Sequence, residues 1–267
     1  MIEVNPHITK IQPYIPGKPI DDVQRELGLD RVIKLASNEN NVGIPESVQK
    51  LLVSKIGELF RYPDGSLFKL RQKLVHRYQL KGSHFIFGNG SDEILQLVAL
   101  AYLAHGKEAL VSEGTFSEYE FVALLVNAPV KKVPLKNYTY DLPAFATAIS
   151  PATKVIFLCN PNNPTGTIFS TKDFTEFMEK VPKNILVVLD EAYFEFAVGT
   201  VSVAGGDYPD GRWLLDQYEN LIVLRTFSKM WAIACCRIGY GMASHAIIEA
   251  LNKARQPFNV SRFAEAA

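Results

Sequence analysis

Short apolar runs alternate with amphipathic stretches along most of the chain. The runs have the length of buried β-strands: Phe85–Phe87, Ala109–Val111, Val155–Leu158, Ile185–Leu189, Leu221–Leu224 and Ile238–Met242. Between several of them the apolar residues recur at helical spacing: Ile94–Leu103, Phe116–Val126 and Thr171–Lys180. Because strands that are apolar throughout must be covered on both faces, this alternation predicts an α/β fold with a mostly parallel sheet flanked by helices.

Two regions depart from this alternation. Residues 1–43 are rich in Pro and Asn with little periodicity, which predicts an extended arm. Ile44–Phe60 and Leu67–Tyr78 show helical spacing on either side of the turn Tyr62–Gly65. Val198–Arg212 contains several glycines and two aspartates, and we expect it to form a long surface loop.

Composition narrows the class of protein. The 267 residues are 48% hydrophobic and 21% charged with a formal net charge of zero, which fits one large domain with or without a smaller appendage. The balanced charge gives no electrostatic reason to expect nucleic acid or a membrane as a partner, and no apolar stretch approaches the roughly 18–20 residues of a membrane span. Cys159, Cys235 and Cys236 match neither a disulfide framework nor a zinc site, and the N-terminus lacks the regions of a signal peptide. We therefore expect no metal and a cytoplasmic location.

A lysine and an arginine follow one of the apolar runs. Lys229 ends the segment Arg225–Lys229 directly after Leu221–Leu224, and Arg237 lies eight positions further on. A lysine amine can form a Schiff base with an aldehyde cofactor, while the flanking hydroxyls and the guanidinium can hold a phosphate on that cofactor. The alternative interpretation is an ordinary surface Ser-Lys pair.

A carboxylate ends another apolar run. Asp190 follows Ile185–Leu189, where we expect poor solvation, so its charge needs a cationic partner or must be neutralised. A pyridinium N–H is such a partner, and Tyr193 can donate to a phenolate oxygen on the same ring. The alternatives are a capping aspartate with a core tyrosine, or a metal site, although no His or third carboxylate lies nearby in the sequence.

Three further segments follow strands and offer complementary contacts. Gly88–Glu93 joins a strand to a helix whose first N–H groups can bind an anion, although this segment taken alone favours a capped helix without a ligand. Asn160–Gly166 is rigid enough to present an amide in a fixed orientation, and its alternative is a tight turn. Phe116 can stack on a cofactor ring or be an ordinary core residue. All of these segments are expected at the C-terminal ends of the strands, where such folds bind ligands.

Together these segments resemble the pyridoxal 5′-phosphate (PLP)-dependent aminotransferases of fold type I, and within them the histidinol-phosphate aminotransferase family. The matching segments follow the family's order over nearly the whole chain: Pro13–Lys18, Leu35–Asn40, Arg61–Gly65, Gly88–Glu93, Asn160–Gly166, Asp190–Tyr193, Arg225–Lys229, Arg237–Gly241 and Arg255–Val260. The first and the last of them point to the narrower family. The resemblance implies the fold of type I PLP-dependent transferases, with a mostly parallel seven-stranded sheet and an incomplete small domain.

The resemblance also implies a role for each matching residue. Lys229 is the lysine that bonds PLP, Asp190 pairs with the pyridine nitrogen, and Tyr193 completes the catalytic set. Asn163 and Tyr193 bond the 3′ oxygen of the cofactor. Phe116 stacks on the ring, where the family usually has tyrosine.

The remaining implied contacts concern the phosphate, the partner subunit and the substrate. The phosphate is held by backbone and side-chain donors of Ser91, Asp92, Thr226, Ser228 and Arg237. Tyr62 reaches the phosphate in the partner subunit, which implies a homodimer with shared active sites. Tyr14 and Asn38 face the substrate.

The chain departs from the family pattern in three places. Asn41 stands where the family has proline, and Ala232 and Cys235 stand where it usually has glycine. If the backbone packs closely between Lys229 and Arg237, the added side-chain volume is expected to strain the phosphate site.

The resemblance also predicts a domain organisation. Residues 1–43 form an N-terminal arm that contributes to the small domain, 44–258 form the large PLP-binding domain, and 259–267 begin a truncated C-terminal small domain. The family continues for roughly another third of this length. We therefore expect the arginine that binds the acidic group of the substrate to lie outside the sequence.

The function implied first is transfer of an amino group between L-histidinol phosphate and 2-oxoglutarate. Two alternatives remain open within the same chemistry: an aromatic or other amino-acid aminotransferase, and an amino-acid-phosphate decarboxylase. An alternative of another class is a catalytically incomplete fragment that binds PLP or only dimerises.

Overall fold

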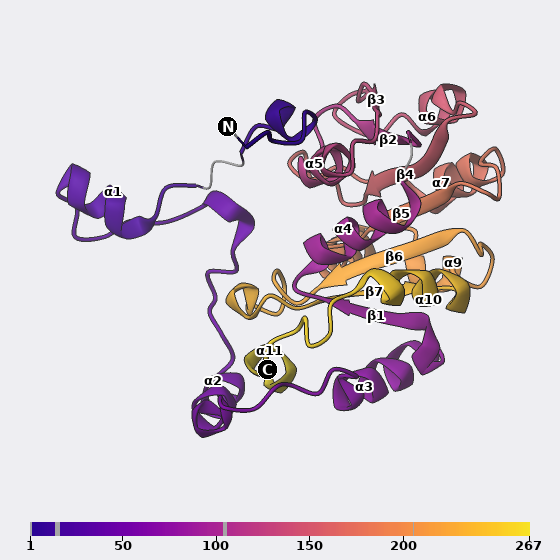
Figure 1. Ribbon diagram of the computed structural model, residues 1–267. Helices are drawn as coiled ribbons and strands as arrows, with labels where there is room; N and C mark the ends of the chain where they lie inside the picture. Colours follow the sequence, from indigo (N-terminus) through magenta and orange to yellow (C-terminus); the bar gives the residue numbers. More distant parts are fainter. Residues whose placement is uncertain (1, 14–16, 104–105, 205) are drawn as a thin grey trace.

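A single twisted sheet forms the centre of the protein, shown by a computed structural model that describes residues 2–13, 17–103, 106–204 and 206–267 (Figure 1). Within these residues the sheet has seven strands in the order β1-β7-β6-β5-β4-β2-β3. The strands are β1 Phe85–Gly88, β2 Glu108–Ser112, β3 Val130–Val133, β4 Thr153–Cys159, β5 Leu186–Asp190, β6 Leu221–Thr226 and β7 Gly239–Ala243. Among them only β7 is antiparallel to its neighbours, β1 and β6. The predicted mostly parallel α/β sheet is confirmed.

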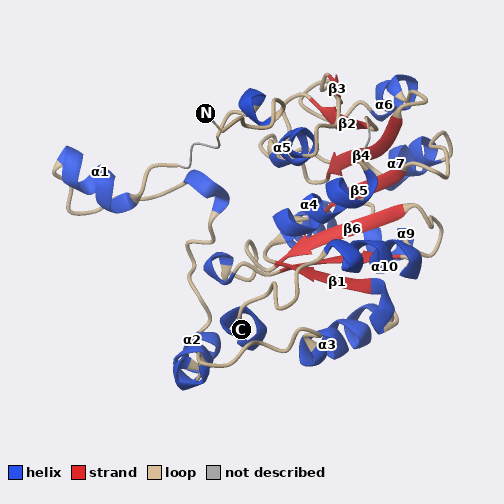
Figure 2. Cartoon of the chain, in the orientation of Figure 1, coloured by secondary structure: helices blue, strands red, loops and turns tan. Residues whose placement is uncertain are grey.

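Helices surround this sheet (Figure 2). They are α1 Ile20–Leu27, α2 Glu46–Ser54, α3 Phe68–Tyr78, α4 Ser91–Tyr102, α5 Glu118–Leu125, α6 Leu142–Ala148, α7 Thr171–Met178, α8 Phe194–Ala204, α9 Gly211–Leu214, α10 His245–Ala254 and α11 Arg262–Ala266. Helix α4 packs against β1, β6 and β7 and against α5 and α10. No helix of the described residues is both long and apolar enough to cross a bilayer.

The hydrophobic core is centred on β4, β5 and β6. Val155–Leu158, Val187–Leu189 and Leu221–Leu224 are completely buried. Each such side chain contributes about 1.5–3 kcal/mol through its removal from water. Because these strands are covered on both faces, the places left for polar groups are the strand ends and the loops that follow them.

Two elements correct the sequence prediction. Strand β3 was not predicted, because its sequence Val-Lys-Lys-Val places two lysines in the middle of a short edge strand. The predicted surface loop Val198–Arg212 is wrong over most of its length, since α8 and α9 occupy it. Arg212 is buried and donates to the backbone oxygen of Tyr78 and to Asp216. The glycines of this region therefore do not prevent helix formation, because Phe194 and Ala197 are buried on one side of α8.

The N-terminal segment lies largely apart from the sheet. Residues 20–27 form helix α1, so the prediction of an extended arm is wrong there. Helix α1 has no buried residue, ends at Gly28 in the left-handed conformation and stands away from the sheet in Figure 1. The predicted helix Ile44–Phe60 is shorter, with α2 followed by a 3-10 turn at Ile56–Glu58. Near the end of the chain, α11 packs against α2.

Candidate active site

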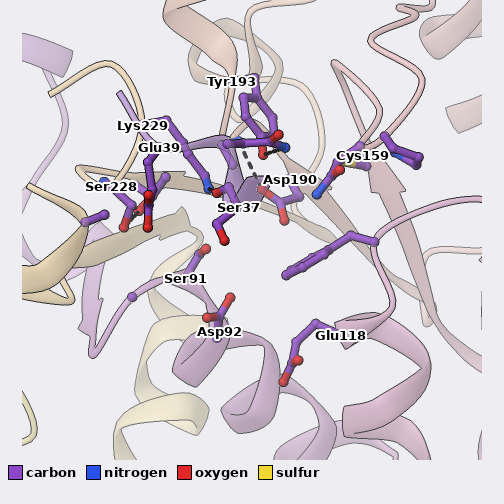
Figure 3. Close-up of a pocket in the computed structure, with 18 of the residues that line it drawn as sticks. Ser37, Glu39, Ser91, Asp92, Glu118, Cys159, Asp190, Tyr193, Ser228 and Lys229 are labelled. Atoms are coloured by element: carbon purple, nitrogen blue, oxygen red, sulfur yellow. Dashed lines mark hydrogen bonds between the residues drawn. The ribbon is translucent and has the colours of Figure 1, made fainter. Parts of the chain in front are cut away.

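One cavity of about 880 Å³ lies at the C-terminal edge of the sheet, bordered by the ends of β5 and β6 and by the loops after β1, β2 and β4 (Figure 3). The predicted cofactor-binding residues other than Tyr62 all line it. They are Ser91, Asp92, Phe116, Asn163, Asp190, Tyr193, Thr226, Ser228, Lys229 and Arg237. The fold thus brings together residues from segments that are far apart in the sequence.

Lys229 reaches into the cavity from the loop after β6. Its Nζ donates to the backbone oxygen of Ser37 at 3.3 Å and lies 5.5 Å from the ring centre of Tyr193. Burial lowers the pKa of Lys229, and the nearby charge of Arg237 acts in the same direction. The amine is therefore neutral more often than an ordinary lysine, as a nucleophile or a base must be.

Asp190 ends β5 and is almost completely buried. Its Oδ2 accepts a hydrogen bond from the Tyr119 hydroxyl at 2.8 Å, and its Oδ1 accepts one from the Ala192 backbone N–H at 3.0 Å. Burial raises the pKa of Asp190 to about 6, although both hydrogen bonds oppose the shift. Among the described residues no cationic side chain forms a salt bridge with it. The carboxylate can therefore accept a further, cationic N–H donor.

The start of α4 forms one wall of the cavity. Gly90 is the N-cap residue, with φ of 80°, and no side chain caps the helix. The interpretation of this segment as a side-chain-capped helix is therefore wrong. Helix N-termini carry N–H groups without intrahelical partners and a partial positive charge, so Ser91 and Asp92 can offer backbone donors to an anion.

Arg237 and two hydroxyls complete this end of the cavity. Arg237 Nη2 donates to Asp92 Oδ2 at 3.0 Å, and the Thr226 hydroxyl donates to Ser228 Oγ at 3.0 Å. A Cβ atom on Gly90 would lie 2.5 Å from Arg237 Nη2. The guanidinium therefore packs directly on the backbone at the start of α4, where it can reach the same anion as the N–H groups.

The asparagines of the loop after β4 have two roles, since one stabilises the loop and another lines the cavity. Asn162 is buried, accepts a hydrogen bond from Thr115 at 2.8 Å and donates to Thr165 at 2.8 Å. Asn163 lines the cavity beside Tyr193. The Tyr193 hydroxyl accepts a hydrogen bond from Asn38 Nδ2 at 2.9 Å, and burial raises the pKa of Tyr193. Tyr193 is therefore a neutral phenol that can donate its proton in a hydrogen bond.

Two residues of the site were missed from the sequence. Tyr119 is completely buried below the cavity and lies edge-on to Phe116, with ring centres 5.6 Å apart. Glu118 faces the cavity, and burial followed by the charge of Asp92 raises the pKa of Glu118 to about 7. Phe116 lies just before α5 and Tyr119 lies in the first turn of α5, so their spacing of three positions is the signal that brings the two rings together.

Some predicted residues lie outside the cavity. Tyr62 is 80% exposed and stacks on Phe258, with ring centres 4.9 Å apart. Tyr14 lies outside the described residues, whereas Asn38 lines the cavity. Of the departures from the family pattern, Ala232 has a φ of 58° and Cys235 lines the cavity. Asn41 is exposed and donates to the backbone oxygen of Lys34 at 3.0 Å.

Comparison with known proteins agrees with this geometry. Residues 30–267 match the family model of class I and II aminotransferases. The histidinol-phosphate aminotransferase of Caldicellulosiruptor saccharolyticus is 46% identical over 260 residues, which cover 97% of this chain and 71% of that protein. Histidinol-phosphate aminotransferase 2 of Pseudomonas fluorescens is also 46% identical, over 98% of this chain and 70% of its own length.

Solved structures give the same result. The histidinol-phosphate aminotransferase of Sinorhizobium meliloti in complex with pyridoxal-5′-phosphate superposes with a TM-score of 0.87 at 25% identity. The match covers 100% of this chain and 70% of that one. The aspartate aminotransferase of Thermus thermophilus, at 19% identity and a TM-score of 0.79, has the same fold and covers 100% of this chain and 71% of its own.

Proposed function

Because the chain belongs to the class I and II aminotransferase family, we propose that it transfers an amino group between L-histidinol phosphate and 2-oxoglutarate, with PLP as its cofactor. The observation that carries the proposal is the single cavity in which Lys229, Asp190 and Tyr193 face an anion site at the start of α4. The relatives that share 41–46% of their residues with this chain support the choice of substrate, since they are histidinol-phosphate aminotransferases.

The residues present fit this cofactor at each of its functional groups. Asp190 is a buried carboxylate with room for a cationic N–H donor, as a protonated ring nitrogen requires. Phe116 provides a flat apolar surface in the cavity wall. The N-terminus of α4 and Arg237 provide the donors for a phosphate.

When bound, the cofactor supplies a carbonyl carbon for the amino group and a ring that withdraws electrons from the substrate carbon. Lys229 Nζ, with its lowered pKa, would take the proton from that substrate carbon and deliver it to the former carbonyl carbon. Tyr193 and Asn163 hold the ring oxygen by hydrogen bonds. Asp190 keeps the ring nitrogen protonated, because the buried carboxylate is stabilised by a positive charge beside it.

We extend the proposal to assembly and organisation. Tyr62 is exposed and remote from the cavity of its own chain, which supports a role in the site of a second copy and hence a homodimer with shared sites. We assign residues 44–258 to the cofactor-binding domain and residues 1–43 to an arm. We also propose a cytoplasmic location, which a biosynthetic reaction of this kind supports.

The test is an activity assay of the purified protein with PLP against a panel of amino donors, with 2-oxoglutarate as acceptor. We expect turnover with L-histidinol phosphate and at least a 10³-fold loss, an order-of-magnitude figure, in Lys229→Ala. Lys253→Ala is the matched control, because Lys253 is an exposed residue of α10 outside the cavity.

Each of four results would reject the assignment. Near-normal turnover of Lys229→Ala would remove Lys229 from the reaction. Turnover of aromatic donors but not of L-histidinol phosphate, or release of carbon dioxide from an amino-acid phosphate, would replace the substrate by one of the alternatives. A protein that binds PLP without any turnover would favour a binding or dimerising role.

A further inference from the structure

We propose that Tyr119 is a positioning residue, whose buried hydroxyl holds Asp190 in the ionised state and in the orientation that binds the ring nitrogen of the cofactor. The inference deepens the proposed function and depends on PLP as the cofactor. Tyr119 itself does not line the cavity, so it acts only through Asp190.

The geometry of Tyr119 leaves its hydroxyl little freedom. Helix α5 carries the side chain into the core, where it is completely buried. The ring stacks on Phe157 of β4, with ring centres 5.2 Å apart and an interplanar angle of 10°, and it meets Phe116 edge-on. Because both neighbours fix the ring, the hydroxyl oxygen is held 2.8 Å from Asp190 Oδ2. This distance is typical of a hydrogen bond to a charged acceptor.

The direction of this hydrogen bond decides its effect. Burial, and then the charge of Asp190, raise the pKa of Tyr119 well above its ordinary value, so the phenol keeps its proton and donates. A donor stabilises the charged form of a carboxylate and opposes the cost of its burial. The second oxygen of Asp190 accepts only the backbone N–H of Ala192 among the described residues. Tyr119 is thus the one described side chain that donates to Asp190.

Other titratable groups also surround Asp190. The charge of Asp92 on α4 raises the pKa of Asp190, and the charge of Lys229 lowers it. Burial raises the pKa of Cys159 on β4 to about 12 and also raises that of Tyr193 and of Tyr140, so these three stay neutral near pH 7. The Tyr119 hydroxyl slightly lowers the pKa of the Cys159 thiol, so its removal leaves Cys159 still neutral near pH 7, and a ratio between variant and wild type isolates the effect on Asp190.

The test variant is Tyr119→Phe, which keeps the ring and its stacking and removes the donor. Loss of a hydrogen bond to a charged group is expected to raise the pKa of Asp190 by about one to two pH units. The dissociation constant of PLP, measured by equilibrium dialysis, should then increase about 2- to 10-fold near pH 7. The difference from wild type should close toward about pH 9, where Asp190 is ionised in both proteins.

Two controls separate this role from a structural one. Tyr102→Phe removes a phenol at the far end of α4, about 16 Å along the helix from the cavity, and should leave the dissociation constant unchanged. In an Asp190→Asn background, Tyr119→Phe should add no further pH dependence, because the amide does not titrate. A ratio between Tyr119→Phe and wild type that is the same from about pH 6 to about pH 9 would overturn the inference and leave the proposed function intact.

Two further outcomes remain informative. If Tyr119→Phe does not fold, the double variant Tyr119→Phe/Asp190→Asn should fold, because a neutral amide no longer needs the donor; a double variant that also fails would show a structural role only and overturn the inference. If the wild-type protein does not bind PLP at any pH, the proposed function and this inference both fall.

Discussion

The ends of β5 and β6 place one pair of polar residues on each face of the sheet, and the two pairs have very different hydrogen-bond and charge partners. Asp190 and Thr226 face the cavity, whereas Glu191 and Arg225, their neighbours in sequence, point to the opposite face. We refer to Asp190 and Thr226, with Lys229 in the loop after β6, as the site face and to Glu191 and Arg225 as the rear face. The four residues at the strand ends are buried, so the difference lies in their partners.

The rear face forms a closed network. Arg225 Nε donates to Glu191 Oε2 at 2.9 Å, and its Nη2 and Nη1 donate to Asp210 at 2.7 Å and to the Tyr78 hydroxyl at 3.1 Å. The other oxygen of Glu191 accepts the backbone N–H of Gly211 at 2.9 Å. No polar side-chain atom of these residues is left without a partner in the described structure.

The charged groups of the site face lack such a closed network of partners. The rear face therefore serves stability, and the site face serves function. Among the described residues Asp190 has only neutral hydrogen-bond donors and no salt bridge, and Lys229 is partly buried, donates to one backbone oxygen and lies over the Tyr193 ring. Groups that the protein does not neutralise are available to a ligand. The rear face therefore fixes the two strand ends, and the site face uses that fixed position to bind.

The largest expected effect is on stability and comes from a substitution that breaks the rear face. Arg225→Met leaves Glu191 buried without its counter-ion, so the free energy of unfolding should fall by about 3–5 kcal/mol. Burial already raises the pKa of Glu191 to about 7 against the opposing effect of Arg225. Because a raised pKa means that stability is lost as the carboxyl ionises, the loss should grow as the pH rises through this value. Urea denaturation of the apoprotein measures it.

The controls for this experiment come from both faces. Arg225→Met/Glu191→Leu should recover most of the loss, because the pair is removed together. Lys229→Met on the site face should change the free energy of unfolding by less than about 1 kcal/mol. An Arg225→Met variant as stable as Lys229→Met would refute the assignment of the stabilising role to the rear face.

A second effect has the opposite sign and concerns the site face. Burial raises the pKa of Asp190 to about 6, so its ionised form destabilises the apoprotein, and the stability present at low pH is lost as the pH rises toward 6. Asp190→Asn should therefore increase the free energy of unfolding near pH 7 by about 1–3 kcal/mol, and by about half of that near pH 5.

Urea midpoints of the apoprotein at both pH values test this expectation. The matched control is Glu219→Gln, an exposed carboxyl in the turn before β6, which should change nothing measurable. If Asp190→Asn is less stable than wild type near pH 7, Asp190 belongs with the rear face as a stabilising residue. The same variant should bind PLP more weakly, which would show a gain in stability at the expense of the ligand.

The two faces were not equally predictable from the sequence. Asp190 and Lys229 follow short runs that are apolar throughout, so their positions at the end of one strand and in the loop after another could be inferred from local pattern alone. The partners Glu191 and Arg225 are 34 residues apart, and Tyr119 and Asp190 are 71 apart. These contacts depend on the pairing of β5 with β6 and on the docking of α5, which one sequence does not reveal.

The errors in the fold have similar causes. Strand β3 pairs only with β2 at the sheet edge, so its central lysines stay in water and hide the strand from a hydrophobicity pattern. Helix α8 includes Gly199, and glycine in a sequence favours a loop, but tertiary packing of Phe194 outweighs the low helix propensity of one glycine.

The smallest expected effect concerns the loop that carries Lys229 on the site face. Ala232 has a φ of 58°, a left-handed conformation that costs an alanine about 1–2 kcal/mol. Glycine adopts it without this cost but loses about 0.5–1 kcal/mol to the greater freedom of the unfolded chain. Ala232→Gly should therefore raise the free energy of unfolding by at most about 1.5 kcal/mol. Ala250→Gly within α10 is the control, and should lower it by about 1 kcal/mol. If both variants lose stability equally, the loop is unstrained, and the closed rear face and the open site face differ in their polar partners alone.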